Sequence, residues 1–260
     1  MNKKHYFNEE AAQRTEKIYS SPDVVGQRQA TLRALALMAG ERVLDIGSGP
    51  GYLAASMGAA VGSGGRVDGV DGSDSMLALA RSRCADQPWV TFHLGDAVEL
   101  PFDDGAFDVA VSTQVLEYVA EIDAALAQIH RVLRPGGRAV IVDTDWDSLV
   151  WHSGDTARMR RVLSAWDEHL IDPHLPRTLA RRLEDLGFAV RAEVIPLMNI
   201  VLEPDTYSYG IVGEIQEFVA GRQGVSAEEA DAWAEELHDL GRAGKYFFSV
   251  NRYLFAAEKG

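Results

Sequence analysis

The sequence predicts a single α/β domain built on a doubly wound, seven-stranded, mostly parallel sheet, with a helical insertion before the last strand. From residue 42 onward, short and nearly continuous apolar runs alternate with segments of helical length. Such runs are typical of strands that are covered on both faces. The chain has 260 residues, of which 47% are hydrophobic, and this is enough to fill one large core.

The expected elements follow one another in strand–helix order. Strands are expected over residues 42–46, 66–71, 90–95, 107–112, 138–143, 187–199 and 245–258. Helices are expected over residues 22–38, 51–61, 74–85, 122–133, 155–170 and 175–186, with two or more over 203–241. Residues 144–154 are expected to be irregular, and no internal repeat is present.

Local signals set several of these boundaries. Ser21 followed by Pro22 is typical of an N-cap and a first helical turn, and Ser226 followed by Ala and two Glu residues is a second capping signal. The helix over 122–133 should end before residues 134–137 (Arg-Pro-Gly-Gly), because this run stops a helix and favours a turn.

Charge and composition exclude several classes of function. The chain has 25 basic and 39 acidic residues, and the net charge of −14 argues against nucleic acid as a partner, since phosphates require a basic surface. No apolar run is long enough for a membrane helix, and polar residues follow the N-terminal residues 1–5 where a signal peptide would be apolar. We therefore expect a cytoplasmic protein without membrane insertion. Cys84 stands alone, so we expect no disulfide and no metal site.

A glycine-rich loop after the first strand is the most informative segment. Residues 43–51 read Val-Leu-Asp-Ile-Gly-Ser-Gly-Pro-Gly, an apolar strand followed by glycine at every second position. Glycines allow a tight turn and a close approach to a ligand, and the helix that follows offers free N–H groups. Tyr52 stands where the dinucleotide fingerprint G-x-G-x-x-G requires its third glycine, and this weakens NAD as an alternative ligand.

Acidic residues follow the next two strands. Asp71 ends the second strand, 20 residues after Gly51, where a carboxylate can accept hydrogen bonds from both hydroxyls of a ribose. Residues 95–97 (Gly-Asp-Ala) end the third strand, where a side-chain oxygen can accept from the exocyclic amine of an adenine. Open α/β sheets bind ligands at the carboxyl ends of their strands, so these residues point to a nucleoside.

At these positions, together with the fourth strand and residues 133–137, the sequence resembles the class I S-adenosylmethionine (SAM) dependent methyltransferases. Among them it is most similar to the small-molecule group that includes the ubiquinone and menaquinone C-methyltransferases. The resemblance covers roughly residues 20–145. It implies a Rossmann-like methyltransferase fold, SAM as the cofactor, S-adenosylhomocysteine as its product and a small-molecule acceptor.

The resemblance also implies a division of the single domain, residues 1–260. Residues 1–40 would form N-terminal helices and a lid, and residues 41–145 the SAM-binding core. Residues 199–243 would form a helical cap over the substrate, and residues 244–258 the final strand.

The same resemblance assigns residues to each part of the cofactor. The methionine part would face Asp45, Gly47, Gly49, Gly51 and Gln114. The ribose and the adenine would face Asp71, Gly72, Met76, Asp96 and Ala97. Tyr19 and Arg28 would close over the cofactor, and Arg28 could pair with its carboxylate.

Methyl transfer from a sulfonium is an in-line displacement that depends mainly on alignment and on exclusion of water. A phenol or enol acceptor also needs a base. The candidates at the strand ends are His152 and Glu117. In the quinone-type group a His often occupies the place of Glu117, so this departure leaves the base open. His169 and His174 are expected to be helix caps or surface residues.

The acceptor is expected to be apolar or aromatic, such as a quinone precursor or another secondary metabolite. Candidate substrate contacts are Tyr118, Trp146, Trp151 and Phe247. The sequence lacks the Asn/Asp-Pro-Pro-aromatic motif of enzymes that methylate planar amino nitrogens. A SAM-binding protein with a non-methylating activity and a ligand-binding scaffold stay open as alternatives. The methylated atom and the oligomeric state, a dimer included, also stay open.

Overall fold

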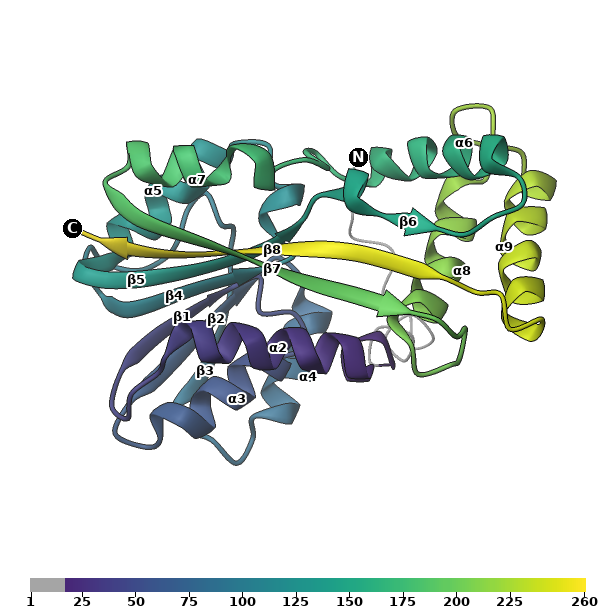
Figure 1. Cartoon of the computed structure of the whole chain (residues 1–260). Helices are drawn as coiled ribbons and strands as arrows, with labels where there is room; N and C mark the ends of the chain where they lie inside the picture. The colour runs from purple at the N-terminus through teal and green to yellow at the C-terminus, as the bar shows by residue number, and fades with distance from the viewer. Residues whose placement is uncertain (1–16) are drawn as a thin grey trace.

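The computed structural model describes residues 17–260. The part of the expected N-terminal lid formed by residues 1–16 lies outside the described residues. In the described part, eight strands form one sheet in the order β3-β2-β1-β4-β5-β8-β6, and β7 pairs with the other edge of β8 (Figure 1). This is the doubly wound arrangement that the sequence predicts, with one short strand more than expected.

The first five strands are parallel to one another. They are β1 (Arg42–Ile46), β2 (Arg66–Asp71), β3 (Val90–Leu94), β4 (Phe107–Thr113) and β5 (Leu133–Thr144). β8 (Phe248–Lys259) runs antiparallel to β5 and to β7 (Phe188–Asn199). The additional strand is β6 (Val150–Trp151), which pairs with the start of β8.

Residues 134–137 differ from the prediction. Helix α5 (Ile122–Val132) ends at the expected place, but the chain enters β5 directly instead of forming a separate turn. Gly136 has a φ of +69°, and the register between β4 and β5 shifts between Phe107 and Val109. The Pro-Gly-Gly run is therefore accommodated as an irregularity within a paired strand.

Two hydrophobic cores lie on opposite faces of the sheet, because neighbouring residues of a strand point to opposite sides. In β4, for example, Val109 belongs to one core and Ala110 to the other. The first core lies beneath α2 (Pro22–Leu35), α3 (Tyr52–Val61) and α4 (Asp74–Arg83). The second lies beneath α5 and α7 (Pro176–Asp185). No helix within residues 17–260 combines the length and the apolar character needed to cross a membrane.

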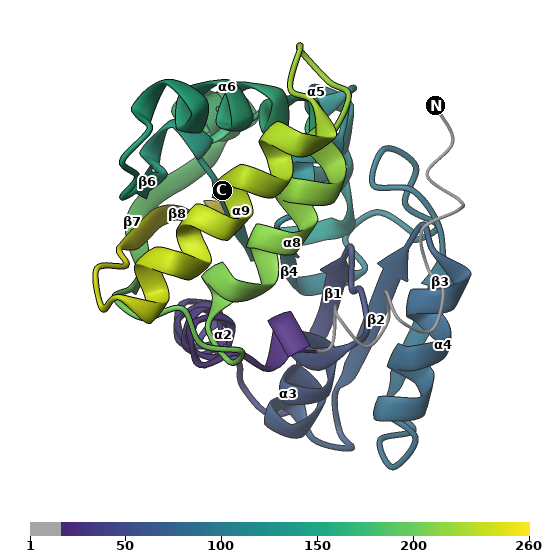
Figure 2. The ribbon, with the colours of Figure 1, turned by 90° about the vertical axis from the view of Figure 1, so that its right-hand side faces the viewer.

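Three helices form a cap at the end of the sheet where β5 ends (Figure 1, Figure 2). They are α6 (Thr156–Trp166), α8 (Tyr207–Val219) and α9 (Ala227–Arg242). The sequence predicts α8 and α9 within residues 199–243, but α6 precedes this range and still packs against both. The cap is therefore assembled from two separate parts of the chain. The predicted serine caps are confirmed: Ser21 accepts a hydrogen bond from the Val24 N–H, and Ser226 accepts one from the Glu229 N–H.

Candidate cofactor and acceptor site

A pocket of about 230 Å³ is lined by residues from the carboxyl end of the sheet, from α2 and from the cap. Of the residues that the sequence assigns to the site, the lining includes Tyr19, Arg28, Asp45, Gly47, Gln114, Glu117, Tyr118 and Trp146. These come from the N-terminal segment, α2, the end of β1 and its following loop, and the segments after β4 and β5. Because open α/β sheets bind ligands at this edge, the pocket is the candidate site.

The glycine loop needs its glycines for steric reasons. Gly47 has a φ of +70°, and a Cβ atom there would lie 2.2 Å from Cγ2 of Val115. Gly51 has a φ of +80°, and a Cβ atom there would lie 2.9 Å from the backbone of Ala80 in α4. Side chains at either position would push the loop away from the segment after β4 or from α4.

Asp71 fixes the shape of this loop. Its Oδ2 accepts a hydrogen bond of 2.8 Å from the Gly49 N–H, and its Oδ1 accepts one of 2.9 Å from the Ser73 N–H. Burial raises the pKa of Asp71 in spite of these bonds. Asp71 does not line the pocket; its carboxylate links the glycine loop to the start of α4. A carboxylate oxygen can accept more than one hydrogen bond, so Asp71 still has capacity for ribose hydroxyls.

The remaining residues assigned to the adenosine part follow the ends of β2 and β3 and do not line the pocket. Asp96 is exposed and accepts a 3.1 Å hydrogen bond from the Val98 N–H. Met76 is buried in α4, with 7% of its surface exposed, while Gly72 and Ala97 lie just past the two strands. Of the residues assigned to the methionine part, the pocket lining contains Asp45, Gly47 and Gln114, whereas Gly49 and Gly51 do not line it. The residues assigned to the adenosine part lie on the neighbouring strand ends and in α4.

Asp45 is the buried acid of the pocket. It is 1% exposed, and its Oδ2 has no hydrogen-bond partner among the described residues; the same holds for the hydroxyl of Ser48. Burial, together with the charge of Asp71, raises the pKa of Asp45 to about 7. Buried polar atoms are normally satisfied, so two unsatisfied acceptors beside a cavity fit a ligand that brings hydrogen-bond donors and positive charge. The ammonium and sulfonium groups of SAM meet this requirement.

Tyr52, which replaces the third glycine of the dinucleotide fingerprint, supports the N-terminal segment. Its ring stacks on Tyr19 at a centroid distance of 5.8 Å and an angle of 14°. Arg28 lies 4.9 Å from the centroid of the Tyr52 ring and donates a 3.5 Å hydrogen bond to the backbone oxygen of Tyr19. Burial, with the charge of Asp71, raises the pKa of Tyr19 to about 12, so its hydroxyl stays neutral. Tyr19 and Arg28 therefore both pack against Tyr52, the residue that follows the glycine loop.

Glu117 is a buried wall of the pocket, with 1% of its surface exposed. Trp146 donates a hydrogen bond of 3.2 Å from Nε1 to Oε2 of Glu117. Behind it, Asp143 is fully buried, and burial together with the charge of Glu117 holds the pKa of Asp143 well above its ordinary value. The position of Glu117 in the pocket, predicted from the strand ends, is thus fixed by an aromatic donor.

His169, which is expected from the sequence to be a helix cap or a surface residue, lines the pocket instead. Its imidazole stacks on Trp166 at 3.6 Å between centroids and meets Trp146 edge to face at 5.2 Å, within the pocket lining. Its Nδ1 hydrogen-bonds the backbone oxygen of Trp166, so this nitrogen carries the proton and Nε2 is the basic one. His169 follows α6, so the expectation that site residues follow the carboxyl ends of strands could not identify it. The neighbouring Trp166 was the feature of the sequence that could have indicated an aromatic pocket wall there.

Three candidates lie away from the pocket. His152 is exposed beyond β6 and is not part of the lining. Trp151 donates a 2.9 Å hydrogen bond to the hydroxyl of Tyr246 and packs against Trp233, in the interior of the cap. Phe247 is 37% exposed. Because β6 continues the sheet along β8 past the end of β5, these side chains are placed outside the cavity.

Further lining residues come from helices and from β8. They include Gln27, Thr31, Trp166, Tyr207, Ile211, Glu214 and Arg252. No motif marks them, because each is an ordinary member of an amphipathic helix or a strand. Their shared position is a consequence of how α2 and the cap pack on the sheet.

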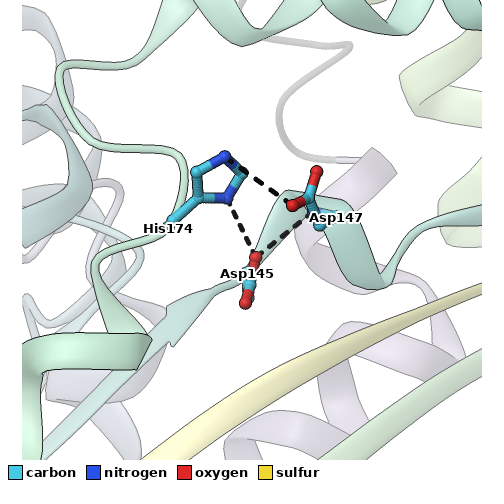
Figure 3. Close-up of side chains that lie close together, drawn as sticks. All are labelled: Asp145, Asp147 and His174. Carbon is cyan, nitrogen blue, oxygen red and sulfur yellow. Dashed lines mark hydrogen bonds and ion pairs between the residues drawn. The ribbon is translucent and has the colours of Figure 1, made fainter.

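Asp145, Asp147 and His174 form a separate cluster (Figure 3), with potential ligand atoms within 4.8 Å of one another. His174 lies 3.0 Å from Asp145. Arg177 of α7 bonds to both carboxylates, at 2.7 Å to Asp145 and 2.5 Å to Asp147. Although burial opposes it, bonds from Arg177 and His174 hold the pKa of Asp145 below its ordinary value. Arg177 already supplies the cation, so the cluster acts as a salt-bridge network that joins α7 to the segment after β5.

Comparison with known proteins agrees with this geometry. Residues 44–141 match a protein family described as a methyltransferase domain. These residues contain the glycine loop, Asp71, Asp96 and Glu117. The part of the chain that holds the glycine loop is therefore similar to a methyltransferase domain.

Individual proteins are similar to longer parts of the chain. An uncharacterized 37.1 kDa protein from transposon TN4556 of Streptomyces fradiae is 34% identical over 238 residues, which are 89% of this chain and 66% of that protein. A demethylmenaquinone methyltransferase of Clavibacter sepedonicus is 43% identical over 116 residues, 45% of this chain and 46% of its own. The matched region thus spans about half the length of this quinone methyltransferase.

Solved structures support the fold of the whole described chain. The YcgJ protein of Bacillus subtilis aligns with a TM-score of 0.64 at 20% identity, covering 90% of this chain and 98% of that protein. At this identity the likeness establishes the shared fold.

Proposed function

We propose that the protein is a SAM-dependent methyltransferase that acts on a small, mostly apolar or aromatic acceptor, such as a quinone precursor or another secondary metabolite. The observation that carries this proposal is one pocket with two different walls. The glycine loop and Asp45 form one wall, and aromatic residues of the segments after β4 and β5 and of the cap form the other. The name of the relative from Clavibacter sepedonicus, a demethylmenaquinone methyltransferase, supports the quinone class.

When bound, SAM would supply an electrophilic methyl group on a positively charged sulfur. Asp45 and Ser48 present buried, unsatisfied oxygens that would accept hydrogen bonds from the methionine part. Asp71 would accept from the ribose, and Asp96 with Ala97 would contact the adenine. Arg28, at the pocket rim, would pair with the carboxylate of the cofactor.

On the acceptor side, the aromatic residues Tyr118, Trp146 and Tyr207 would hold a flat apolar molecule and exclude water. Positioning and dehydration supply most of the rate enhancement in such a displacement. Where the acceptor loses a proton, Nε2 of His169 is the base that we propose, because its other nitrogen is held by a carbonyl and its ring lies in the pocket lining. Glu117, already bonded to Trp146, would orient the aromatic wall.

Titration calorimetry with SAM, S-adenosylhomocysteine and NAD tests the cofactor half of this proposal. We expect saturable binding of the first two ligands and none of NAD. An acceptor screen read by product mass then tests the reaction, since a methylated product gains one CH₂ and a rearranged product gains nothing. The proposal would be contradicted if neither SAM nor S-adenosylhomocysteine bound, or if NAD alone bound.

A matched pair of variants tests the ribose assignment. Asp71→Ala should weaken binding of S-adenosylhomocysteine about 10- to 150-fold, since a hydrogen bond to a charged group contributes roughly 1.5–3 kcal/mol. Asp74→Ala, at an exposed acid in the first turn of α4, is the control and should bind normally. Equal affinities of the two variants would reject the role of Asp71.

A further inference from the structure

Arg252 is a buried cation on the wall of the pocket that the proposed function leaves without a role. It lies on β8 opposite Thr144 of β5, with 4% of its surface exposed, and it belongs to the pocket lining. A buried guanidinium is normally paired with a carboxylate, because only a close partner offsets the cost of removing the charge from water.

The contacts of Arg252 are with neutral groups. Its Nη1 donates to the side-chain oxygen of Gln27, and its guanidinium lies 4.9 Å from the centroid of the Tyr207 ring. Its Nε has no hydrogen-bond partner among residues 17–260, and no salt bridge joins it to a carboxylate in that part of the chain. The Nε–H donor of this buried guanidinium is therefore available to a ligand in the pocket.

The acids in and behind the pocket wall form no salt bridge with Arg252 among the described residues. The wall contains Asp45, Glu117 and Glu214, and Asp143 lies behind it. Asp143 feels the charge of Arg252, but burial and Glu117 still hold its pKa well above the ordinary value, which favours the neutral carboxyl. Glu214 of α8 lines the same pocket and forms no salt bridge with Arg252. Arg252 therefore has no carboxylate within salt-bridge distance among the described residues.

We propose that Arg252 binds an anionic oxygen group of the acceptor, a carboxylate or an ionised enol, so that the substrate is an aromatic acid. This inference rests on the proposed function. A planar guanidinium is suited to such a group, because its donors match the spacing of two oxygens. The neighbouring ring of Tyr207 would contact the apolar body of the same molecule. Arg252 would therefore favour acceptors that carry a negative charge, while the aromatic wall would favour acceptors with a flat, apolar body.

Calorimetry on protein saturated with S-adenosylhomocysteine tests this inference with two matched pairs of probes. One pair is 2-naphthoate and its neutral isostere 2-naphthamide, and the other is 2-hydroxy-1,4-naphthoquinone, an anion at neutral pH, and neutral 1,4-naphthoquinone. We expect at least one anion to bind about tenfold or more tightly than its neutral partner, the size of one charge-assisted hydrogen bond. The pair that shows the preference identifies the carboxylate or the enolate class.

Arg252→Met should abolish this preference, and Arg252→Lys should keep part of it because the charge remains without the planar fork. Arg191→Leu removes an exposed arginine of β7 and should behave as the parent protein. If Arg252→Met does not fold, the Lys variant still has to lose affinity for the anion while it binds S-adenosylhomocysteine normally.

Two results would overturn the inference. One is equal binding of the charged and neutral probes by the parent protein. The other is an Arg252→Met variant that keeps the anion preference but binds S-adenosylhomocysteine poorly, which would place the cofactor carboxylate on Arg252. Failure of the parent protein to bind S-adenosylhomocysteine would reject the proposed function instead, and the preference of the ligand-free protein for the anionic probes would still test Arg252.

Discussion

At Asp45, burial and the charge of Asp71 raise the pKa of a pocket carboxyl to about 7, against 3.8 for an ordinary aspartate. The folded state therefore binds more protons than the unfolded state between these two values. The free energy of unfolding falls as the pH rises through this window, because the folded protein must then hold a buried charge. Ligand binding at Asp45 would offset this cost with a positive group.

The variant Asp45→Asn should stabilise the ligand-free protein at pH 8, on the order of 4 kcal/mol, because it removes the buried charge. It should change stability little at pH 4, where Asp45 is already neutral in the folded state. Thermal melts at the two pH values, with calorimetry of S-adenosylhomocysteine at pH 8, measure both effects. A gain in stability that is the same at pH 4 and pH 8 would contradict the titration of Asp45, and undiminished affinity would contradict its contact with the cofactor.

His169 and His152 form a natural pair for testing the base. His169→Gln should lower the turnover of an ionisable acceptor about 10²- to 10⁴-fold, the usual contribution of general base catalysis. It should leave the affinity for S-adenosylhomocysteine unchanged. His152→Gln should retain activity, since that side chain is exposed outside the pocket. Turnover against pH for the parent and both variants measures this, and a larger loss in His152→Gln would reverse the assignment.

At the level of elements, a hydrogen-bond network of the Asp23 and Asn199 side chains, here called the clasp, joins α2, β7 and α8. Asp23 accepts a 3.0 Å hydrogen bond from the side-chain amide of Asn199 and a 2.9 Å bond from the Tyr207 N–H. The side-chain oxygen of Asn199 accepts from the Ser208 N–H at 3.1 Å. The first turn of α8 is thus capped by residues of two other elements, and this fixes Tyr207 in the pocket wall.

Removal of the clasp by Asn199→Ala should destabilise the protein by about 1–2 kcal/mol, because buried donors and acceptors lose their partners. Hydrogen exchange should become faster at the start of α8, while β1 and β4 stay protected. Asn251→Ala, in the neighbouring strand β8, is the control. Exchange in α8 that is unaltered by Asn199→Ala would show that the cap is held by its apolar contacts alone.

At the level of the whole molecule, the N-terminal segment and the cap both contribute residues to one pocket. A ligand in that pocket should therefore stabilise both. At a concentration 100 times its dissociation constant, S-adenosylhomocysteine should stabilise the fold by about 2.7 kcal/mol. Thermal melts measure the total, and hydrogen exchange should slow in α2 and α8 as well as in the glycine loop. Protection confined to the loop would mean that the cap does not respond to the cofactor.

The sequence by itself determined the fold class, the order of the strands along the chain and the glycine loop. These features depend on local patterns: apolar runs of strand length, glycines where φ is positive, and acidic residues at strand ends. The positions of Asp45, Gly47 and Glu117 in the pocket lining followed from the same rule, since parallel strands end at one edge of the sheet.

Only the tertiary structure decided the other half of the pocket. His169 and Arg252 reach it from the end of α6 and from β8, elements that no local signal connects to the glycine loop. The pairing of β6 with β8 moved His152 away from it, and the packing of Trp151 on Trp233 placed that tryptophan in the interior of the cap. The physical reason is that a strand-end rule fixes one edge of one sheet, whereas a cap packs by long-range contacts between side chains far apart in the sequence.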